Sequence, residues 1–393
     1  MLEADVAVLG AGAAGLSLAH RLSEARSGAP SVLLVDAPPG PLRPPPRTWC
    51  YWEEGPGRFD AAVRAEWSRL RVRPPASTPI EQDISPLRYK MIRSDDFEAL
   101  VARDLARGGN VRRLEATVES VEEVPGAARV RMTGSDGRAE LLAARWVFDS
   151  RPLGSLPAAR TTVLQHFRGW IVRTAGAAFD PATVELMDFR TPQPAEGLSF
   201  GYVLPTAVNE ALVEYTEFSP RVLSEAGYRL ALRHYTRDIL LLPDFEIVAE
   251  EGGVIPMTDA PFARRVGTSV FRIGAAGGAT RPSTGYTFAG LQRQTRAVAS
   301  ALRRGRHPEP PPAHSARSRA MDAVLLRALD SGRVDGPALF SRLFARVPMA
   351  QVLRFLDGRT SLRDDLAVGL HTPIGPMLRT VAELGRLPRR PAR

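Results

Sequence analysis

The sequence predicts an α/β protein with three parts: a parallel-sheet domain built from βαβ units, an antiparallel sheet, and a C-terminal group of helices. Three observations favour this fold class. The chain opens with a strand, a glycine turn, a helix and a second strand. Residues 163–254 have the pattern of antiparallel strands, in which successive side chains point to alternate faces, and the spacing typical of helices returns near the C-terminus. Strands that alternate with helices form parallel sheets, whereas strands joined by short turns form antiparallel ones.

The composition is that of a globular protein without an internal disulfide. A length of 393 residues suggests two or three domains. Cys50 is the only cysteine, so a reducing cytosol is the expected compartment. The chain opens with acidic residues that run into a strand, so we expect no secretory signal there. No apolar run approaches the roughly 18 residues that cross a bilayer.

Positive charge is concentrated towards the C-terminus. Residues 301–393 carry 17 arginines and 8 acidic residues, whereas the charges of the preceding residues balance. Such a region suits an anionic partner, either membrane phospholipid or nucleic acid. Lys90 is the only lysine, however, so the abundance of arginine can equally reflect genome composition.

The first βαβ unit carries a dinucleotide-binding motif. An apolar strand at Asp5–Leu9 precedes a helix at 16–22, and residues 31–37 (SVLLVDA) form the next strand. Between the first strand and the helix stand the glycines of a G-x-G-x-x-G pattern: Gly10, Gly12 and Gly15. They allow a tight turn, close approach of a pyrophosphate, and packing of helix on strand. Asp36 ends the second strand, where its carboxylate can accept a hydrogen bond from a ribose hydroxyl. The unit predicts a Rossmann-like domain.

The following segments return to this sheet. A proline-rich connector at residues 37–47 leaves the βαβ unit in an extended form. DDFEALVARDLA has helical spacing, and we expect Asp95 and Asp96 to supply its N-cap and a first-turn acid. VRRLEATVESVEEV, ARVRMTG and RWVFDSRP have the composition of strands.

The antiparallel region contains an unusual strand. LSFGYVLP and ALVEYTEFS form a hairpin across TAVNE. In the second strand Glu214 shares a face with Leu212 and Phe218, while Glu217 shares the other face with Tyr215. Whichever face is buried takes a glutamate with it, and glutamate is rarely buried without a partner or a function.

A second glycine cluster favours FAD over NAD. IGAAGGATRPSTGYTF, at residues 273–288, follows a strand and begins a long helix. Its helix N-terminus can face the distal part of an extended ligand. Pro282, Thr284 and Tyr286 make a merely flexible loop a poor alternative. Together with the G-x-G-x-x-G motif, this cluster predicts a binding site for an extended FAD molecule.

A second proline-rich break, HPEPPPAH, precedes the C-terminal helices. One of them is expected in ALFSRLFARVPMAQVLRFL, with an apolar stripe formed by Leu339, Phe340, Leu343, Phe344 and Val347. Arg342 and Arg346 lie off the stripe. Such a helix suits the interface of an anionic membrane. Packing of the stripe on the protein's own core is the other interpretation.

Motifs along about three quarters of the chain resemble those of the soluble, flavin-dependent lycopene β-cyclases of carotenoid biosynthesis. In chain order they are RTWCYWE (47–53), YKMIRSDDF (89–97), FDSRP (148–152), MDFR (187–190), YVLP (202–205), LVEYT (212–216), GVIPMTD (253–259) and the second glycine cluster. The resemblance implies a flavoprotein-hydroxylase fold, with a Rossmann-like FAD-binding domain, an antiparallel β-sheet substrate domain and C-terminal helices. It also implies closure of the linear ψ-ends of lycopene to β-ionone rings, giving γ-carotene or β-carotene. That reaction needs reduced FAD, with NAD(P)H as external reductant, and causes no net redox change.

The resemblance assigns site residues one by one. Those matching the family's flavin motifs are Gly10, Gly12, Gly15, Asp36, Asp149, Arg151, Gly274, Gly277, Gly278, Pro282, Thr284 and Gly285. Glu214 matches the catalytic glutamate. Many members place a second acid directly after it, and here Tyr215 stands there, so a two-carboxylate mechanism requires Glu217 or Asp188. The hydroxylases usually have aspartate directly after the glycine that corresponds to Gly274, and this chain has Ala275.

Other candidates have weaker signals. Trp49, Tyr51 and Trp52 suit either a tunnel for a polyene or ordinary core packing. His20 and His166 lack the spacing of metal ligands, so we expect no metal site.

The predicted organisation follows from these assignments. Residues 1–160 and 255–305 form a discontinuous FAD-binding domain, residues 161–254 a substrate domain, and residues 306–393 a helical region that is a possible membrane-docking surface. The expected partners are lycopene and an anionic membrane surface, with no nucleic acid. We expect a cytoplasmic protein, peripheral to the cytoplasmic membrane.

Two alternatives remain open from the sequence. One is an FAD-dependent monooxygenase, or a cyclase of another isoprenoid or polyene. The other is a non-catalytic, membrane-peripheral flavin-binding protein. The mass of the product distinguishes the monooxygenase, and a requirement for Glu214 excludes the non-catalytic protein.

Overall fold

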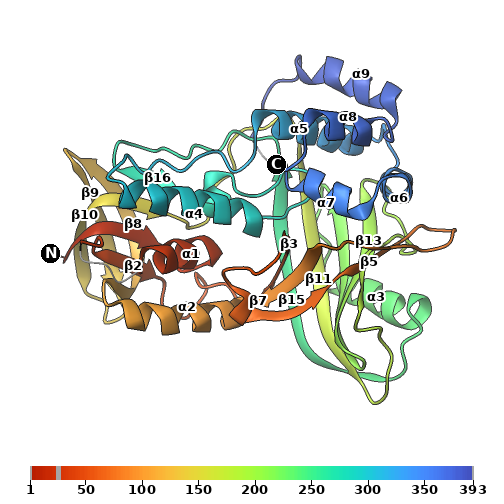
Figure 1. Cartoon of the computed structure of the whole chain (residues 1–393), viewed down its shortest axis with the longest axis horizontal. Helices are drawn as coiled ribbons and strands as arrows, with labels where there is room; N and C mark the ends of the chain where they lie inside the picture. Colours follow the sequence, from red (N-terminus) through yellow and green to blue (C-terminus); the bar gives the residue numbers. More distant parts are fainter. Residues whose placement is uncertain (1, 24–27, 392–393) are drawn as a thin grey trace.

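Two large β-sheets and a layer of C-terminal helices make up the computed structural model, which describes residues 2–23 and 28–391 (Figure 1). The first sheet contains β1 (Leu2–Leu9), β2 (Val32–Asp36), β8 (Val111–Val124), β9 (Ala127–Gly134), β10 (Ala139–Asp149) and β16 (Val270–Arg272). Strands β16, β10, β1, β2 and β8 run parallel in that order, and β9 is antiparallel to both β8 and β10. The predicted βαβ unit is confirmed.

Residues 6–9 of β1 and 32–35 of β2 are buried on both faces of this sheet, as in other parallel sheets. One face packs against α1 (Ala13–Leu22), α2 (Ser94–Gly108) and α4 (Phe288–Arg303). The other face packs within the curved meander of β8, β9 and β10. Helix α2 begins at Ser94, with Arg93 as its N-cap. Asp95 and Asp96 therefore both lie in the first turn, and the expectation that one of them is the N-cap is wrong.

The second sheet has the order β15, β11, β14, β13, β12, β5, β6. Its strands are β5 (Arg69–Arg73), β6 (Ile80–Asp83), β11 (Thr162–Thr174), β12 (Thr183–Asp188), β13 (Leu198–Ala207), β14 (Glu210–Ser219) and β15 (Phe245–Thr258). All neighbours are antiparallel except β12 and β5. The predicted hairpin is β13–β14, and β14 lies centrally, between β11 and β13.

This sheet does not follow the predicted domain limits. β5 and β6 come from the segment assigned to the FAD-binding domain, and β15 runs across residues 254 and 255. One face carries α3 (Glu225–His234) and the following turn of π-helix, Tyr235–Ile239. A small sheet connects the two large ones, and consists of β3 (Thr48–Glu54), β7 (Leu87–Arg93) and β4 (Val63–Trp67).

The C-terminal helices cover the other face of the second sheet (Figure 1). They are α5 (Ala316–Asp330), α6 (Gly336–Arg346), α7 (Met349–Leu356), α8 (Leu362–Gly369) and α9 (Ile374–Leu384). The segment predicted as one helix is two helices, because the chain turns at Pro348 between α6 and α7. Its apolar stripe is buried in the same core as β5. Of the two interpretations of the stripe, packing on the protein's own core is therefore confirmed, and docking of this stripe on a membrane is wrong. Within residues 2–23 and 28–391, no helix has both the length and the apolar character needed to cross a bilayer.

Candidate functional site

The first glycine loop leaves the N-terminus of α1 open. Gly10 adopts a φ of 90°, in the left-handed region that favours glycine. A Cβ at Gly15 would lie 1.8 Å from the carbonyl oxygen of Gly10, so helix and loop pack too closely for any other residue. Gly12 is the N-cap, no side chain caps it, and the first turn contains no acid. A Cβ at Gly12 would meet no atom within 4 Å, so a phosphate has space in front of the free amides.

The second glycine loop meets the first. It contains the 3₁₀ turn Gly274–Gly277 directly after β16. A Cβ at Gly274 would lie 2.7 Å from the Cβ of Ala14, so the two loops touch. The amide of Gly274 donates to Oε1 of Gln294, 3.1 Å away, which attaches the loop to α4. Both loops can therefore contact one extended ligand.

The predicted carboxylates brace these loops. The carboxylate of Asp36 accepts a 3.0 Å hydrogen bond from the amide of Ala11 and a second one from Arg113. Each oxygen keeps a lone pair for a ribose hydroxyl. Arg151 forms a bidentate pair with Asp149, with distances of 2.9 and 2.8 Å. This pair therefore organises the end of β10 beside the first loop and offers no free charge.

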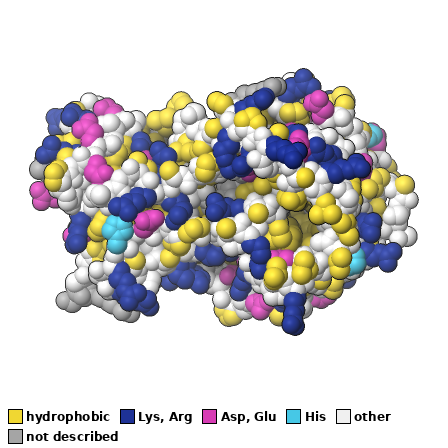
Figure 2. Space-filling view, turned by 90° about the horizontal axis from the view of Figure 1, so that it is seen from above, with side chains coloured by type: hydrophobic (Ala, Val, Ile, Leu, Met, Phe, Trp, Pro, Cys, Tyr) yellow, Lys and Arg dark blue, Asp and Glu magenta, His cyan; other side chains and the backbone are white. Residues whose placement is uncertain are grey.

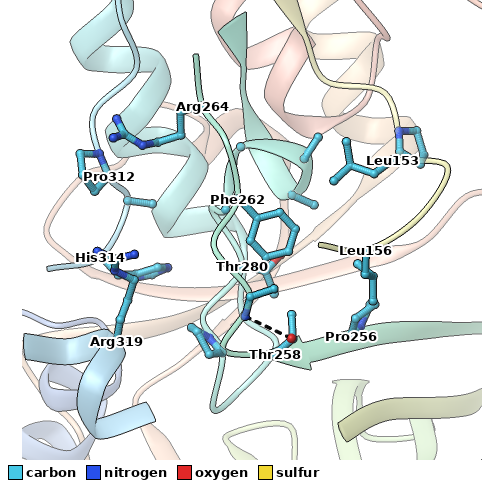
Figure 3. A pocket seen from close by; sticks show the side chains of 18 residues that line it. Leu153, Leu156, Pro256, Thr258, Phe262, Arg264, Thr280, Pro312, His314 and Arg319 are labelled. Atoms are coloured by element: carbon cyan, nitrogen blue, oxygen red, sulfur yellow. Dashed lines mark hydrogen bonds between the residues drawn. The ribbon is translucent and has the colours of Figure 1, made fainter. Parts of the chain in front are cut away.

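A cavity of about 240 Å³ lies beside the second glycine loop (Figure 3). Gly277, Gly278 and Pro282 contribute to its wall, and Phe262 points into it. Thr280, Arg264, His314 and Arg319 add polar groups, whereas Glu214 is not part of the lining. The second loop thus borders free volume, as a ligand-binding loop must.

The residues present fit FAD. Beside Gly285, the side-chain oxygen of Gln165 is buried without a hydrogen-bond partner. An unpaired buried acceptor next to a ligand loop suits a donor on the ligand. The first loop and α1 would hold the pyrophosphate, Asp36 the ribose, and residues 274–285 the flavin half.

Glu214 lies on the face of β14 that the C-terminal helices cover. The residue is 8% exposed, and Leu212 and Phe218 flank it on the same face. Its Oε1 accepts a 2.6 Å hydrogen bond from the hydroxyl of Thr216. Burial raises the pKa of Glu214 from 4.5 to about 8, against the lowering effect of Thr216, and the charge of Glu251 adds to the rise. At neutral pH this carboxyl group keeps its proton and can donate it.

Three tyrosines form a hydrogen-bonded chain next to Glu214. The hydroxyl of Tyr89 lies 2.7 Å from those of both Tyr202 and Tyr286. Tyr202 is the direct cross-strand neighbour of Glu214. Burial raises the pKa of all three tyrosines, so they stay neutral. Because Tyr286 belongs to the second glycine cluster, the chain connects the surroundings of Glu214 to the predicted flavin loop.

The three aromatic residues of β3 separate into two groups. Trp49 and Tyr51 stack on Phe288 of α4, so they pack in the core of the first domain. Trp52 points the other way and contacts Tyr286 edge to face, at 4.8 Å between ring centroids. Cys50 lies on the same side as Trp52, and burial raises the pKa of its thiol to about 12. Of the three candidates, Trp52 alone borders the tyrosine chain.

A second carboxylate, Glu251, faces Glu214 and was missed from the sequence. Gly169 of β11 pairs with Glu214 on one side and with Glu251 on the other. A Cβ at Gly169 would lie 3.6 Å from both the Cβ of Glu214 and the Cγ of Glu251. The two acids therefore occupy the same face with only a glycine between them. One glycine separates Glu251 from the GVIPMTD motif, but sequence spacing does not reveal which strands lie side by side.

The two acids proposed from the sequence as partners of Glu214 lie elsewhere. Glu217 occupies the opposite face of β14, where it accepts a hydrogen bond of 2.8 Å from the hydroxyl of Tyr215. Asp188 pairs with Arg190 and accepts a hydrogen bond from Tyr235, which packs on that opposite face. Neither can act beside Glu214, because the sheet separates them from it.

Solved structures share this fold at low sequence identity. The chain matches p-nitrophenol 4-monooxygenase PnpA from Pseudomonas putida with a TM-score of 0.63 and 18% identity, covering 99% of this chain and 100% of that one. A geranylgeranyl bacteriochlorophyll reductase-like protein from Thermoplasma acidophilum matches with a TM-score of 0.62 and 13% identity, over 99% and 100% of the two chains. The flavin-dependent monooxygenase PieE, solved with FAD and substrate, matches with a TM-score of 0.57 and 14% identity, over 98% of this chain and 72% of its own.

These likenesses confirm the predicted fold class, a Rossmann-like domain of flavoprotein-hydroxylase type with an antiparallel sheet and C-terminal helices. No curated protein matches the chain significantly. The family described as "Lycopene cyclase protein" matches residues 5–382. That match spans nearly the whole chain, including both glycine loops and β14, and it confirms the resemblance read from the motifs: the chain belongs to the lycopene cyclase family.

Proposed function

We propose that this chain is a lycopene β-cyclase, which closes one or both linear ends of lycopene by acid-initiated cyclisation. The observation that carries the proposal is the burial of Glu214 on a sheet face lined by apolar and aromatic side chains, which raises the pKa of its carboxyl group to about 8. An isolated carbon–carbon double bond is a very weak base, so its protonation needs a strong donor in a dry site. Membership of the lycopene cyclase family supports the choice of substrate.

Glu214 would give its proton to the terminal double bond of the substrate. The resulting cation is attacked by the neighbouring double bond, which closes the ring. Return of a proton from the adjacent carbon to the Glu214 carboxylate then completes an isomerisation and restores the donor. Water would trap the cation, and Leu212, Phe218 and Trp52 would keep water away from it. The tyrosine chain adds neutral aromatic faces, which attract cations.

Reduced FAD, held by the two glycine loops, would supply negative charge that stabilises the cation, which gives a redox cofactor a role in a reaction without net redox change. We propose NAD(P)H as its external reductant. Tyr286 belongs to the second glycine cluster, which would hold this cofactor, and its hydrogen bond to Tyr89 connects that cluster to the surroundings of Glu214.

The test is anaerobic turnover of lycopene by the reduced holoenzyme and by Glu214→Gln. Removing the donor should lower the rate about 10²- to 10⁴-fold, the contribution typical of a general acid, while FAD content stays normal. Glu217→Gln is the matched control on the opposite face and should have a much smaller effect. Near-normal β-carotene formation by Glu214→Gln would overturn the proposal. In a parallel aerobic reaction with NAD(P)H, a product heavier by one oxygen atom would indicate a monooxygenase instead.

We also propose that the protein works peripherally at an anionic membrane, because a C40 hydrocarbon partitions into the bilayer. The surface that supports this proposal is different from the buried stripe on α6. It is the outer face of α8 and α9, where large apolar side chains are 49% to 66% exposed: Leu362, Leu366, Leu370, Ile374, Leu378 and Val381.

A further inference from the structure

Glu251 is buried, yet three groups favour its charged form. Its carboxylate accepts a 2.8 Å hydrogen bond from the hydroxyl of Thr48 and a 3.2 Å hydrogen bond from Arg93. Burial raises the pKa of Glu251 above its ordinary value of 4.5, and the Thr48 hydroxyl and the charges of Arg93 and Arg47 oppose this rise. Thr48 begins β3 and Arg93 ends β7, so the small sheet supplies two of these partners, and Arg47 comes from the segment just before β3.

Glu214 has a different set of neighbours. Tyr202 of β13, Cys50 of β3 and Tyr286 of the second glycine cluster surround it, and all three are neutral at physiological pH. Thr216 is its hydrogen-bond donor, and no arginine contributes to its pKa shift. Within residues 2–23 and 28–391, the one charged group that shifts its pKa is Glu251, from β15.

The two carboxyl groups are close enough to influence each other. They stand on either side of Gly169, as its cross-strand neighbours. A Cβ added at Gly169 would lie 2.9 Å from Cδ1 of Leu212, so the glycine keeps the space between the two acids free of a side chain. Two carboxylates in one apolar space do not ionise equally, because ionisation of one opposes ionisation of the other. The cations and the hydroxyl beside Glu251 decide which group carries the negative charge.

We infer that Glu251 is a positioning residue, whose carboxylate is held ionised by Thr48 and Arg93 and thereby keeps the proton on Glu214. This inference rests on the proposed function, since it assigns the second acid of the same site. It also explains how a chain with Tyr215 after Glu214 retains two carboxyl groups: the second one comes from β15, two strands away in the sheet.

The experiment compares the pH dependence of cyclisation in the wild type and in Glu251→Gln. The protonated donor is lost as pH rises through the pKa of Glu214, about 8, so wild-type activity should fall along an alkaline limb near that pH. Without the charge of Glu251 the donor ionises more easily, and the limb should move about one pH unit lower. Glu251→Asp keeps the charge and should leave the limb close to its wild-type position.

The matched control is Glu250→Gln, at the exposed neighbouring residue that pairs with Trp170 on the opposite face of β15. It should not move the limb. Thr48→Val removes one partner of Glu251 and provides a second variant; it should shift the limb in the same direction by a smaller amount. FAD content is measured for each protein, so that loss of the fold is recognised.

Infrared difference titration supplies a readout that needs no turnover. The band of a protonated carboxyl group that disappears in Glu214→Gln should titrate near pH 8 in the wild type and lower in Glu251→Gln. If the band shifts but lycopene is not converted, the carboxyl pair stands and the proposed substrate fails. If band and limb are the same in Glu251→Gln and Glu250→Gln, Glu251 does not control the proton of Glu214, and the inference is overturned.

Discussion

Burial of Glu214 lowers the free energy of unfolding at neutral pH and provides a protonated acid. A carboxyl group among Leu212, Phe218 and neutral tyrosines is kept neutral because burial disfavours its charge. The unfolded chain ionises this group at about its ordinary pKa of 4.5, whereas the folded protein retains the proton up to about pH 8. Folding therefore takes up a proton between these values, and the stability contribution present at low pH is lost as pH rises through that window.

Glu214→Gln should accordingly stabilise the protein at neutral and alkaline pH. The amide cannot ionise in either state, so the variant avoids a linkage cost on the order of 3 kcal/mol at pH 7. Urea unfolding of the FAD-saturated proteins between pH 4.5 and 8.5 measures this difference. It should grow with pH and level off above about pH 8. Parallel stability curves for the two proteins would show that Glu214 is not held neutral in the folded state.

At the scale of elements, the site depends on where strands and helices begin, end and pair. Strand β14 is central, so both of its faces are covered, and Glu214 and Glu217, on opposite faces, are both buried. Helix α1 begins at a glycine with open space before it, while Gly15 one turn later permits contact with the first loop. The two glycines of one motif are thus needed for different reasons. Gly15 allows the helix to pack against the first loop, and Gly12 leaves space for a ligand.

Gly12→Val should separate these two requirements. Its backbone φ of −77° suits any residue, and a Cβ there would meet no atom within 4 Å, so the fold should persist. The side chain would occupy the space of the pyrophosphate, so FAD affinity should fall by at least an order of magnitude. Equilibrium dialysis against FAD and thermal unfolding of the apoprotein measure the two effects. Gly176→Val is the control, because that position also has open space but lies outside both glycine loops; stoichiometric FAD in purified Gly12→Val would refute the assignment of the first loop.

At the scale of the whole molecule, the C-terminal helices both complete the core and expose an unusual surface. α6 and α7 bury their apolar faces on the second sheet, whereas α8 and α9 turn apolar side chains outwards. The acidic residues of these two helices all have partners: Asp365 pairs with Arg317 at 2.8 Å, Glu383 pairs with Arg327 at 2.6 Å, and Asp364 forms a capping box with Ser361. The exposed charges of α8 and α9 are arginines, Arg363 and Arg379. Figure 2, seen from the side of these helices, shows apolar and arginine side chains together on this face.

Such a face should bind an anionic bilayer through apolar insertion and arginine attraction. The double variant Leu366→Glu/Leu378→Glu should lose most flotation with anionic liposomes and keep its thermal stability, because both side chains are exposed. Leu230→Glu, at an equally exposed leucine on α3, is the matched control. Wild-type binding should weaken with added salt. Equal flotation of the wild type, the double variant and the control would exclude this surface as the docking site.

The sequence by itself determined the parts whose signals are local. The G-x-G-x-x-G turn, the second glycine cluster, the hairpin of β13 and β14 and the alternation that buries Glu214 all depend on residues close together in the chain, where backbone conformation and side-chain period decide the outcome. The tertiary structure decided what depends on packing between distant segments. Glu251 became the neighbour of Glu214 through the pairing of β11 with both β14 and β15, and the tyrosine chain joined residues from β7, β13 and the second loop. An apolar helical stripe has the same sequence pattern whether it faces a core or a membrane. Only the packing of α6 on the second sheet, and the absence of such packing on the outer faces of α8 and α9, distinguished the buried stripe from the exposed one.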